Sequence, residues 1–183
     1  INGQNTYATT ELNQSKLVNA TNISLARTIL HEAIHAFIYN YINNQSQLTQ
    51  AQKDQILALP FAKKLKEFIR LFHPNQSNQF HNAMALNFHD DIRDALKALC
   101  PIMGITIGGT DLDTFCSDMA WGGLQDDNTD SPWMQLLTSE DRARITKRLE
   151  LELNNIPTFS GYVPMDGSNF YVSLNRIGTK ACP

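Results

Sequence analysis

The sequence predicts a mainly α-helical domain of the α+β kind, with a small N-terminal sheet and a C-terminal hairpin. Apolar residues recur at three- and four-residue steps over several long segments, whereas short extended segments are expected only near the two ends. The length of 183 residues is that of about one domain with its own core. We therefore expect residues 1–183 to form a single domain. Because the chain starts without Met, we expect a trimmed or processed chain, or the C-terminal piece of a longer protein.

Composition narrows the classes of partner. The formal net charge is -3, and 15 Lys and Arg face 18 Asp and Glu, so no overall positive field is present to attract a phosphate backbone. No apolar run approaches the roughly 20 residues that a membrane-spanning helix needs. We expect neither a nucleic-acid partner nor a membrane span.

The N-terminal third contains the clearest helix signal. Thr6–Leu12 and Lys16–Val18 are the candidate strands of the N-terminal sheet. Thr21 or Asn22 can cap a helix whose apolar residues continue to Asn43. This segment is apolar around most of its circumference, so we expect it in the middle of the fold rather than on its surface.

Three further helices follow. Ala51–Leu59 and Phe61–Phe72 are two amphipathic segments separated by Pro60. The helical pattern returns over Gln79–Leu99, and Cys100–Pro101 is expected to end it.

Glycine and proline mark the central loops. Asp111 can cap a helix through Trp121, which Gly122–Gly123 would end. We expect this glycine pair to form a tight turn whose backbone closely approaches a neighbouring element. Ser131–Pro132 has the pattern of a cap followed by a first-turn proline.

The C-terminal part changes from helix to strand. A last helix runs from Ser139 to about Leu153, with acidic residues in its first turn. Tyr162–Pro164 and Asn169–Leu174 are short extended segments around the turn Met165–Ser168, and together they predict a hairpin.

The cysteines do not form a metal-binding pattern. Cys100, Cys116 and Cys182 are widely spaced and lack any C-x-x-C pair, which argues against a zinc ribbon. At most one disulfide can form.

One motif carries chemistry. His31 and His35 belong to an H-E-x-x-H motif inside the clearest helix, and residues four apart lie on one helix face. Both imidazoles can therefore bind one Zn²⁺. Zinc lowers the pKa of its bound water to about 7, and Glu32 is placed to take the remaining proton as general base when the oxygen attacks a carbonyl. The motif predicts amide hydrolysis.

A catalytic zinc needs a third protein ligand and an open position. His81 is the preferred candidate, because a first-turn position lets it point across a groove between helices. His89 is the alternative, and Asp90 or Asp91 would serve in a His-His-Asp site. If they are not ligands, His73 and His89 are expected on the surface.

Supporting residues are less strongly indicated. A ligating histidine usually donates its second N–H to a carboxylate or a carbonyl, and an oxyanion donor is expected near the zinc. The candidate carboxylates are Asp90, Asp91 and Asp118. The candidate oxyanion donors are Tyr39, Tyr162, Tyr171 or a distant Arg.

Three segments together resemble a known family. Ala26–Ala36 contains the motif, His81–Ala85 opens the second long helix, and Ala120–Leu124 contains the glycine pair. With these segments the chain resembles bacterial zincin-like metallopeptidase domains of the broad SprT-like kind, over roughly residues 20 to 140.

The resemblance implies a zincin-like helical fold and a ligand set. In such domains the first helix supplies two histidine ligands and the catalytic glutamate, and a histidine that begins a later helix completes the set. This implies His31, Glu32, His35 and His81. The chain lacks the zinc ribbon and basic tail of the DNA-repair proteases with a similar core, so their DNA-linked role is not expected. Similar domains also occur at the ends of exported bacterial proteins and of toxins. The resemblance therefore implies an exported or secreted effector of a bacterium.

We therefore expect a zinc metallopeptidase with a protein or peptide substrate and, as a further partner, an inhibitor or immunity protein. One alternative is a non-catalytic binding module with structural zinc or none. Another is hydrolysis of a non-peptide amide, such as one in cell-wall material, because the same chemistry serves any carbonyl. Specificity is expected from the loops Gly104–Asp111 and Tyr162–Phe170.

Overall fold

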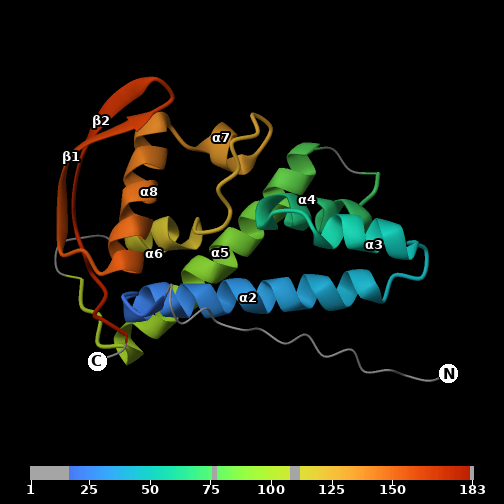
Figure 1. Ribbon diagram of the computed structural model, residues 1–183, viewed down its shortest axis with the longest axis horizontal. Helices are drawn as coiled ribbons and strands as arrows, with labels where there is room; N and C mark the ends of the chain where they lie inside the picture. Colours follow the sequence, from blue (N-terminus) through green and yellow to red (C-terminus); the bar gives the residue numbers. More distant parts are fainter. Residues whose placement is uncertain (1–16, 76–77, 108–111, 182–183) are drawn as a thin grey trace.

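The chain is mainly α-helical with one two-stranded antiparallel sheet, as expected (Figure 1). A computed structural model describes residues 17–75, 78–107 and 112–181, without the side chains of residues 78–81, 83 and 84. The helices are α2 (Asn22–Asn43), α3 (Gln50–Leu57), α4 (Phe61–Phe72), α5 (Asn78–Ile102), α6 (Leu112–Ala120), α7 (Pro132–Leu136) and α8 (Ser139–Asn154). The strands are β1 (Thr158–Met165) and β2 (Ser168–Asn175).

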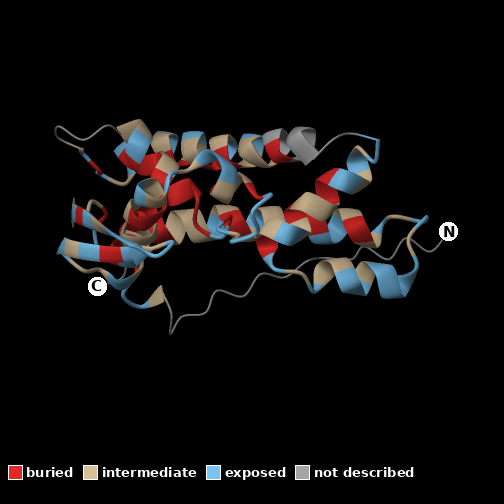
Figure 2. Cartoon of the chain, turned by 90° about the horizontal axis from the view of Figure 1, so that it is seen from above, coloured by how far each residue is buried: buried red, intermediate tan, exposed pale blue. Residues whose placement is uncertain are grey.

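Helix α2 is the base on which the other elements are arranged. In Figure 1 it runs along the bottom of the molecule, α5 rises obliquely across it, and α3 and α4 lie over its C-terminal half. Helix α8 stands over its other end and has the hairpin on its outer side. Figure 2 shows that buried positions gather on the inward faces of α2, α4 and α5.

Helix α2 is fixed by a cap at its start and by core residues near its end. The Thr21 side chain accepts a hydrogen bond from the Ser24 backbone N–H, as expected for an N-cap. Ile38 and Ile42 are fully buried against α4 and α8 residues. However, Ile29 and Phe37 are about half exposed, at 50% and 55%, so the expectation that this helix lies in the middle of the fold rather than on its surface is wrong. Phe37 is covered only in part, by an edge contact with Phe68 of α4 at 5.7 Å between the ring centroids.

Helix boundaries lie within two residues of expectation except at one proline. Helix α4 has the expected bounds, while α3 begins with a capping box at Thr49 and ends two residues early. Helix α5 continues through Pro101 to Ile102, so the expected end at Leu99 is wrong. Proline in the last turn removes only one donor, and the helix ends where Gly104 adopts a φ of +68°.

The C-terminal hairpin is confirmed and is longer than expected. Its two-residue turn places Asp166 at φ 51° and Gly167 at φ 78°, which are the left-handed angles that a tight hairpin turn requires. On its inner face, Val163 and Val172 pack with Ala143 of α8.

The expected N-terminal sheet is not supported by the described residues. Thr6–Leu12 lies outside them. Leu17 is helical and Val18 lies in a turn closed by the Ala20 N–H donating to the Leu17 carbonyl at 2.9 Å, so the strand expected at Lys16–Val18 is wrong. The turn leads directly into the cap of α2, where Thr21 forms a single bridge with Lys180.

Cys100 and Cys116 are buried free thiols with their Sγ atoms 3.9 Å apart, and burial raises the pKa of both thiols; Cys182 lies outside the described residues. None of the helices in the described ranges combines the length and the apolarity that crossing a membrane requires.

A buried carboxylate joins three distant segments. Glu152 of α8 is fully buried and accepts hydrogen bonds from the Thr21 hydroxyl at 2.8 Å and from the backbone N–H groups of Ile177 and Gly178 at 2.7 and 3.1 Å. A residue larger than glycine would not fit at position 178, because its Cβ would lie 2.8 Å from this carboxylate. Glu152 thus connects the start of α2, the end of α8 and the C-terminal segment.

We predict that Glu152→Ala lowers the free energy of unfolding by about 3 kcal/mol or more, because it leaves three buried donors without an acceptor. Glu152→Gln keeps one acceptor oxygen and should cost less. Urea unfolding followed by circular dichroism measures both. Glu150→Gln, at an exposed position of the same helix, is the control, and an equal effect at the two positions would contradict the structural role.

Candidate metal centre

Two imidazoles of α2 converge on one point. His31 and His35 are one helical turn apart, and their Nε2 atoms lie 3.1 Å from each other. Together with a carboxylate oxygen of Glu32, these atoms form a group of potential ligands that all lie within 4.8 Å of one another. In the described part of the chain no other group of three histidine, cysteine or acidic side chains is as close.

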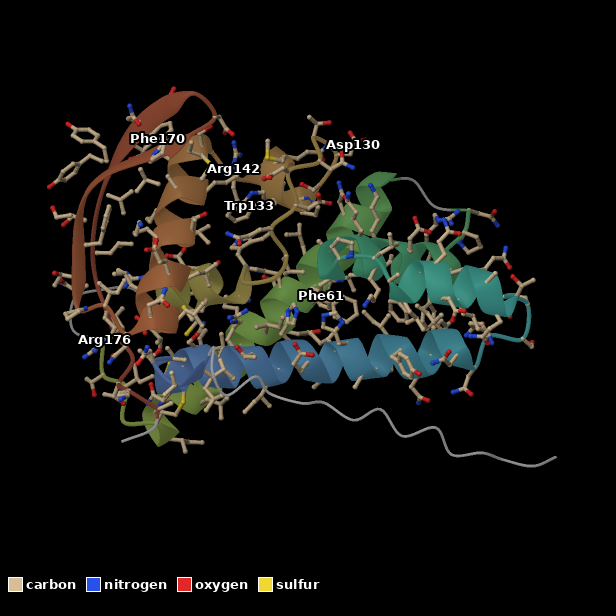
Figure 3. All side chains as sticks on the ribbon, viewed as in Figure 1. Phe61, Asp130, Trp133, Arg142, Phe170 and Arg176 are labelled. Atoms are coloured by element: carbon tan, nitrogen blue, oxygen red, sulfur yellow. The ribbon has the colours of Figure 1, made fainter. Side chains whose placement is uncertain are left out.

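An aromatic ring covers the imidazole pair. Phe61, the first residue of α4, has its ring centroid 4.0 Å from that of His31 and 4.5 Å from that of His35. In Figure 3 the Phe61 label lies directly above the middle of α2. The ring restricts both imidazoles to a narrow range of orientations and removes water from one side of the pair.

Gly122 and Gly123 pack closely against the helix that carries the motif. Gly123 has a φ of +87°, and a Cβ there would lie 2.2 Å from Cε1 and 2.7 Å from Nδ1 of His31. At Gly122 a Cβ would lie 2.7 Å from an Arg27 guanidinium nitrogen. The expected close approach of this turn to a neighbour is therefore confirmed, and the neighbour is the motif helix. Arg27, His31 and His35 follow one another at four-residue steps, so they form one stripe of α2.

The site keeps its imidazoles uncharged. The pKa of His31 is lowered to about 3, mainly by burial and also by the charges of His35, Arg27 and Lys64. Burial and the charge of Lys64 also lower the pKa of His35, against an opposing effect of Glu32. Neutral imidazole is the form that binds a metal, because protonation occupies the ligand nitrogen.

The donor set fits a metal ion. Two nitrogens that share a tetrahedral Zn²⁺ at about 2.0–2.1 Å lie about 3.3–3.4 Å apart, which is close to the 3.1 Å between the two Nε2 atoms. His31, His35 and Glu32 could therefore hold or serve a metal ion.

The described residues do not supply a third ligand. The backbone at His81 lies in the first turn of α5, but its side chain is outside the described residues. The alternative ligand His89 is not placed with the pair: its Nε2 lies 3.1 Å from the Ser117 carbonyl and its Nδ1 3.2 Å from Asp90. The expectation that His89 is a surface residue is wrong, because it is buried beside Trp121 with ring centroids 4.6 Å apart.

The candidate carboxylate partners and oxyanion donors also lie away from the imidazole pair. Asp118 is buried and paired with Arg144 of α8, while Tyr39 is exposed on α2. The two hairpin tyrosines, Tyr162 and Tyr171, pack against each other at 5.4 Å on the exposed face of the sheet. Asp90 and Asp91 do not join the cluster of His31 and His35.

Sequence reasoning missed three residues at this centre, which are Phe61, Arg27 and Lys64. The four-residue stripe could have identified Arg27. Phe61 and Lys64 belong to α4, and no local pattern indicates which face of one helix packs on another.

Comparisons of the chain with protein-family models, with curated proteins and with solved structures find no match.

We predict that Gly123→Ala lowers the free energy of unfolding by about 3 kcal/mol and weakens Zn²⁺ binding at least tenfold, because the methyl group would displace His31. Gly167→Ala is the matched control, since Gly167 also has a positive φ but nothing within 4 Å of an added Cβ. That change should cost only about 1 kcal/mol of backbone strain. Equal losses in thermal unfolding for the two variants would contradict the contact with His31.

The low pKa of His31 predicts a pH-dependent stability in metal-free protein. Between its usual pKa of 6.5 and about 3, the unfolded chain binds more protons than the folded one, so stability falls as the pH falls. We expect a loss of about 2 kcal/mol between pH 8 and pH 5 that His31→Gln largely removes. Urea unfolding in the presence of a chelator measures this, and the same pH dependence in both proteins would contradict it.

Proposed function

We propose that the protein is a zinc-dependent hydrolase that cleaves peptide bonds, with His31 and His35 as metal ligands and Glu32 as general base. The observation that carries this proposal is the convergence of the two Nε2 atoms at 3.1 Å beside a carboxylate. A separation of 3.1 Å also fits a hydrogen bond between two neutral imidazoles, in which one ring donates its N–H to the other. The Glu32 carboxylate beside both rings is the feature that favours a metal centre.

Different residues would bind the metal and transfer the proton: His31 and His35 bind it, and Glu32 transfers the proton. Zinc, when bound, polarises a carbonyl and lowers the pKa of a water molecule to about 7. Glu32 is half-buried and forms no ion pair with the nearby cations Arg27 and Lys64, whose charges act on it from a distance. A Glu32 carboxylate oxygen can therefore accept a proton from the attacking water and pass it to the nitrogen of the departing amine.

The third ligand is proposed from the resemblance to SprT-like zincins, which places it at His81. Support from the described residues is limited to the helical backbone at this position in the first turn of α5. His89 is a weaker candidate because hydrogen bonds to Ser117 and Asp90 already occupy both of its nitrogens.

The experiment is zinc content together with cleavage of a denatured protein such as casein. Glu32→Gln should keep one zinc per chain and lose about 10²- to 10⁴-fold in cleavage rate, because only the proton acceptor is removed. His31→Ala, His35→Ala and His81→Ala should each lose zinc. His73→Ala, at the end of α4, is the histidine control and should keep both zinc and activity.

Two results would contradict the proposal. Unchanged cleavage by Glu32→Gln would remove the assigned general base. Absence of stoichiometric zinc, or a zinc closed by four protein ligands, would instead favour a non-catalytic binding module. If the protein cleaves a non-peptide amide but no protein, the proposed zinc-dependent hydrolysis stands and the proposed peptide substrate is wrong.

A further inference from the structure

Two cations flank the candidate metal centre, and neither forms an ion pair within the described part of the chain, although the charge of Glu32 acts on both. Arg27 precedes His31 by one helical turn, and its Nε is buried without a hydrogen-bond partner. Lys64 is half-buried on α4, and among the described residues it has no ion-pair partner. Unpaired cations near a buried site are costly unless an anion compensates them.

Lys64 lies on the face of α4 that meets the imidazole pair of α2. Phe61 contacts both rings, and Lys64 follows it by three residues, so the two side chains share a face of α4. The charge of Lys64 lowers the pKa of His31 and of His35. Burial lowers the pKa of the Lys64 ammonium group itself, against an opposing effect of the Glu32 charge. Helix α4 also begins at this site without a capping side chain, so its partly positive N-terminal end adds to the field.

A bound metal ion would increase the imbalance. The two imidazoles are uncharged ligands, and Glu32 is the single carboxylate of the cluster. A divalent ion together with Arg27 and Lys64 therefore leaves a clear excess of positive charge. This excess exists in the resting site, before any reaction begins, so it favours an anionic group on the substrate itself and not only a charge that develops during the reaction.

We propose that Lys64 binds a carboxylate of the substrate, so that the protein prefers peptides with a negative group next to the scissile bond. This inference rests on the proposed function and names the substrate class of the same site. Lys64 is the group that reaches the substrate, because its side chain is partly exposed. Arg27 packs against the Gly122 backbone and contributes its charge from behind.

The test compares binding of three dansyl-labelled tetrapeptides to zinc-loaded protein, in a Glu32→Gln background that prevents turnover. The first is tetra-alanine with a free terminal carboxylate, the second is its terminal amide, and the third is an amide with one Ala replaced by Glu. We expect the free acid to bind about tenfold more tightly than the neutral amide. Lys64→Gln should abolish this preference, whereas Lys64→Arg and the neighbouring control Lys63→Gln should keep it.

Zinc affinity is the readout that does not depend on a substrate. Lys64→Gln should bind Zn²⁺ about fivefold more tightly, because a like charge near the ion is removed, and Lys63→Gln should not. A merely structural lysine would not produce an increase in zinc affinity together with a loss of carboxylate preference.

The outcomes separate this inference from the proposed function. Stoichiometric zinc with equal affinity for the acid and both amides, or a preference that survives in Lys64→Gln, overturns the role of Lys64 and leaves the metal site in place. No zinc in the parent protein overturns both proposals. If the glutamate-containing amide binds like the free acid, the inference is supported with a side-chain carboxylate as the ligand; if only the free acid binds tightly, it is supported with the chain terminus as the ligand.

Discussion

The architecture around the candidate site depends on holding two uncharged imidazoles against each other in a poorly hydrated space. His31 and His35 can converge because Phe61 covers both rings and Gly123 leaves room for one of them. Burial keeps His31 unprotonated, with a pKa of about 3, so its nitrogen stays available to a metal at neutral pH. The helix supplies the spacing, but two other segments supply the orientation.

Those two segments are themselves fixed by the rest of the fold. The glycine turn follows α6, and its Trp121 packs against His89 of α5 and Trp133 of α7. At the far end of α2, Glu152 connects the N-cap to α8 and to the C-terminal segment. Elements far from the motif thus position α2 and the turn that contacts it, so the geometry of two histidines in a single helix depends on the surrounding fold.

Much of this arrangement could be predicted from local patterns. The bounds of α4, the cap of α2, the Asp166–Gly167 turn and the close approach of Gly122–Gly123 follow from short-range rules that depend on a few neighbouring residues. Pro101 could not be predicted correctly, because its cost depends on whether it lies in the last turn of the helix. Lys64 and Phe61 could not be identified either, since the packing of α4 on α2 is a tertiary property. His81 stays a prediction from resemblance.

The central claim is that the motif histidines hold a metal ion, and a crystal structure of the zinc-loaded protein, with anomalous data at the zinc edge, tests it most directly. We predict one anomalous peak about 2.0–2.1 Å from the Nε2 atoms of both His31 and His35, with a position left open to solvent. A peak bound by other residues, or none under zinc excess with the two imidazoles turned apart, would contradict it.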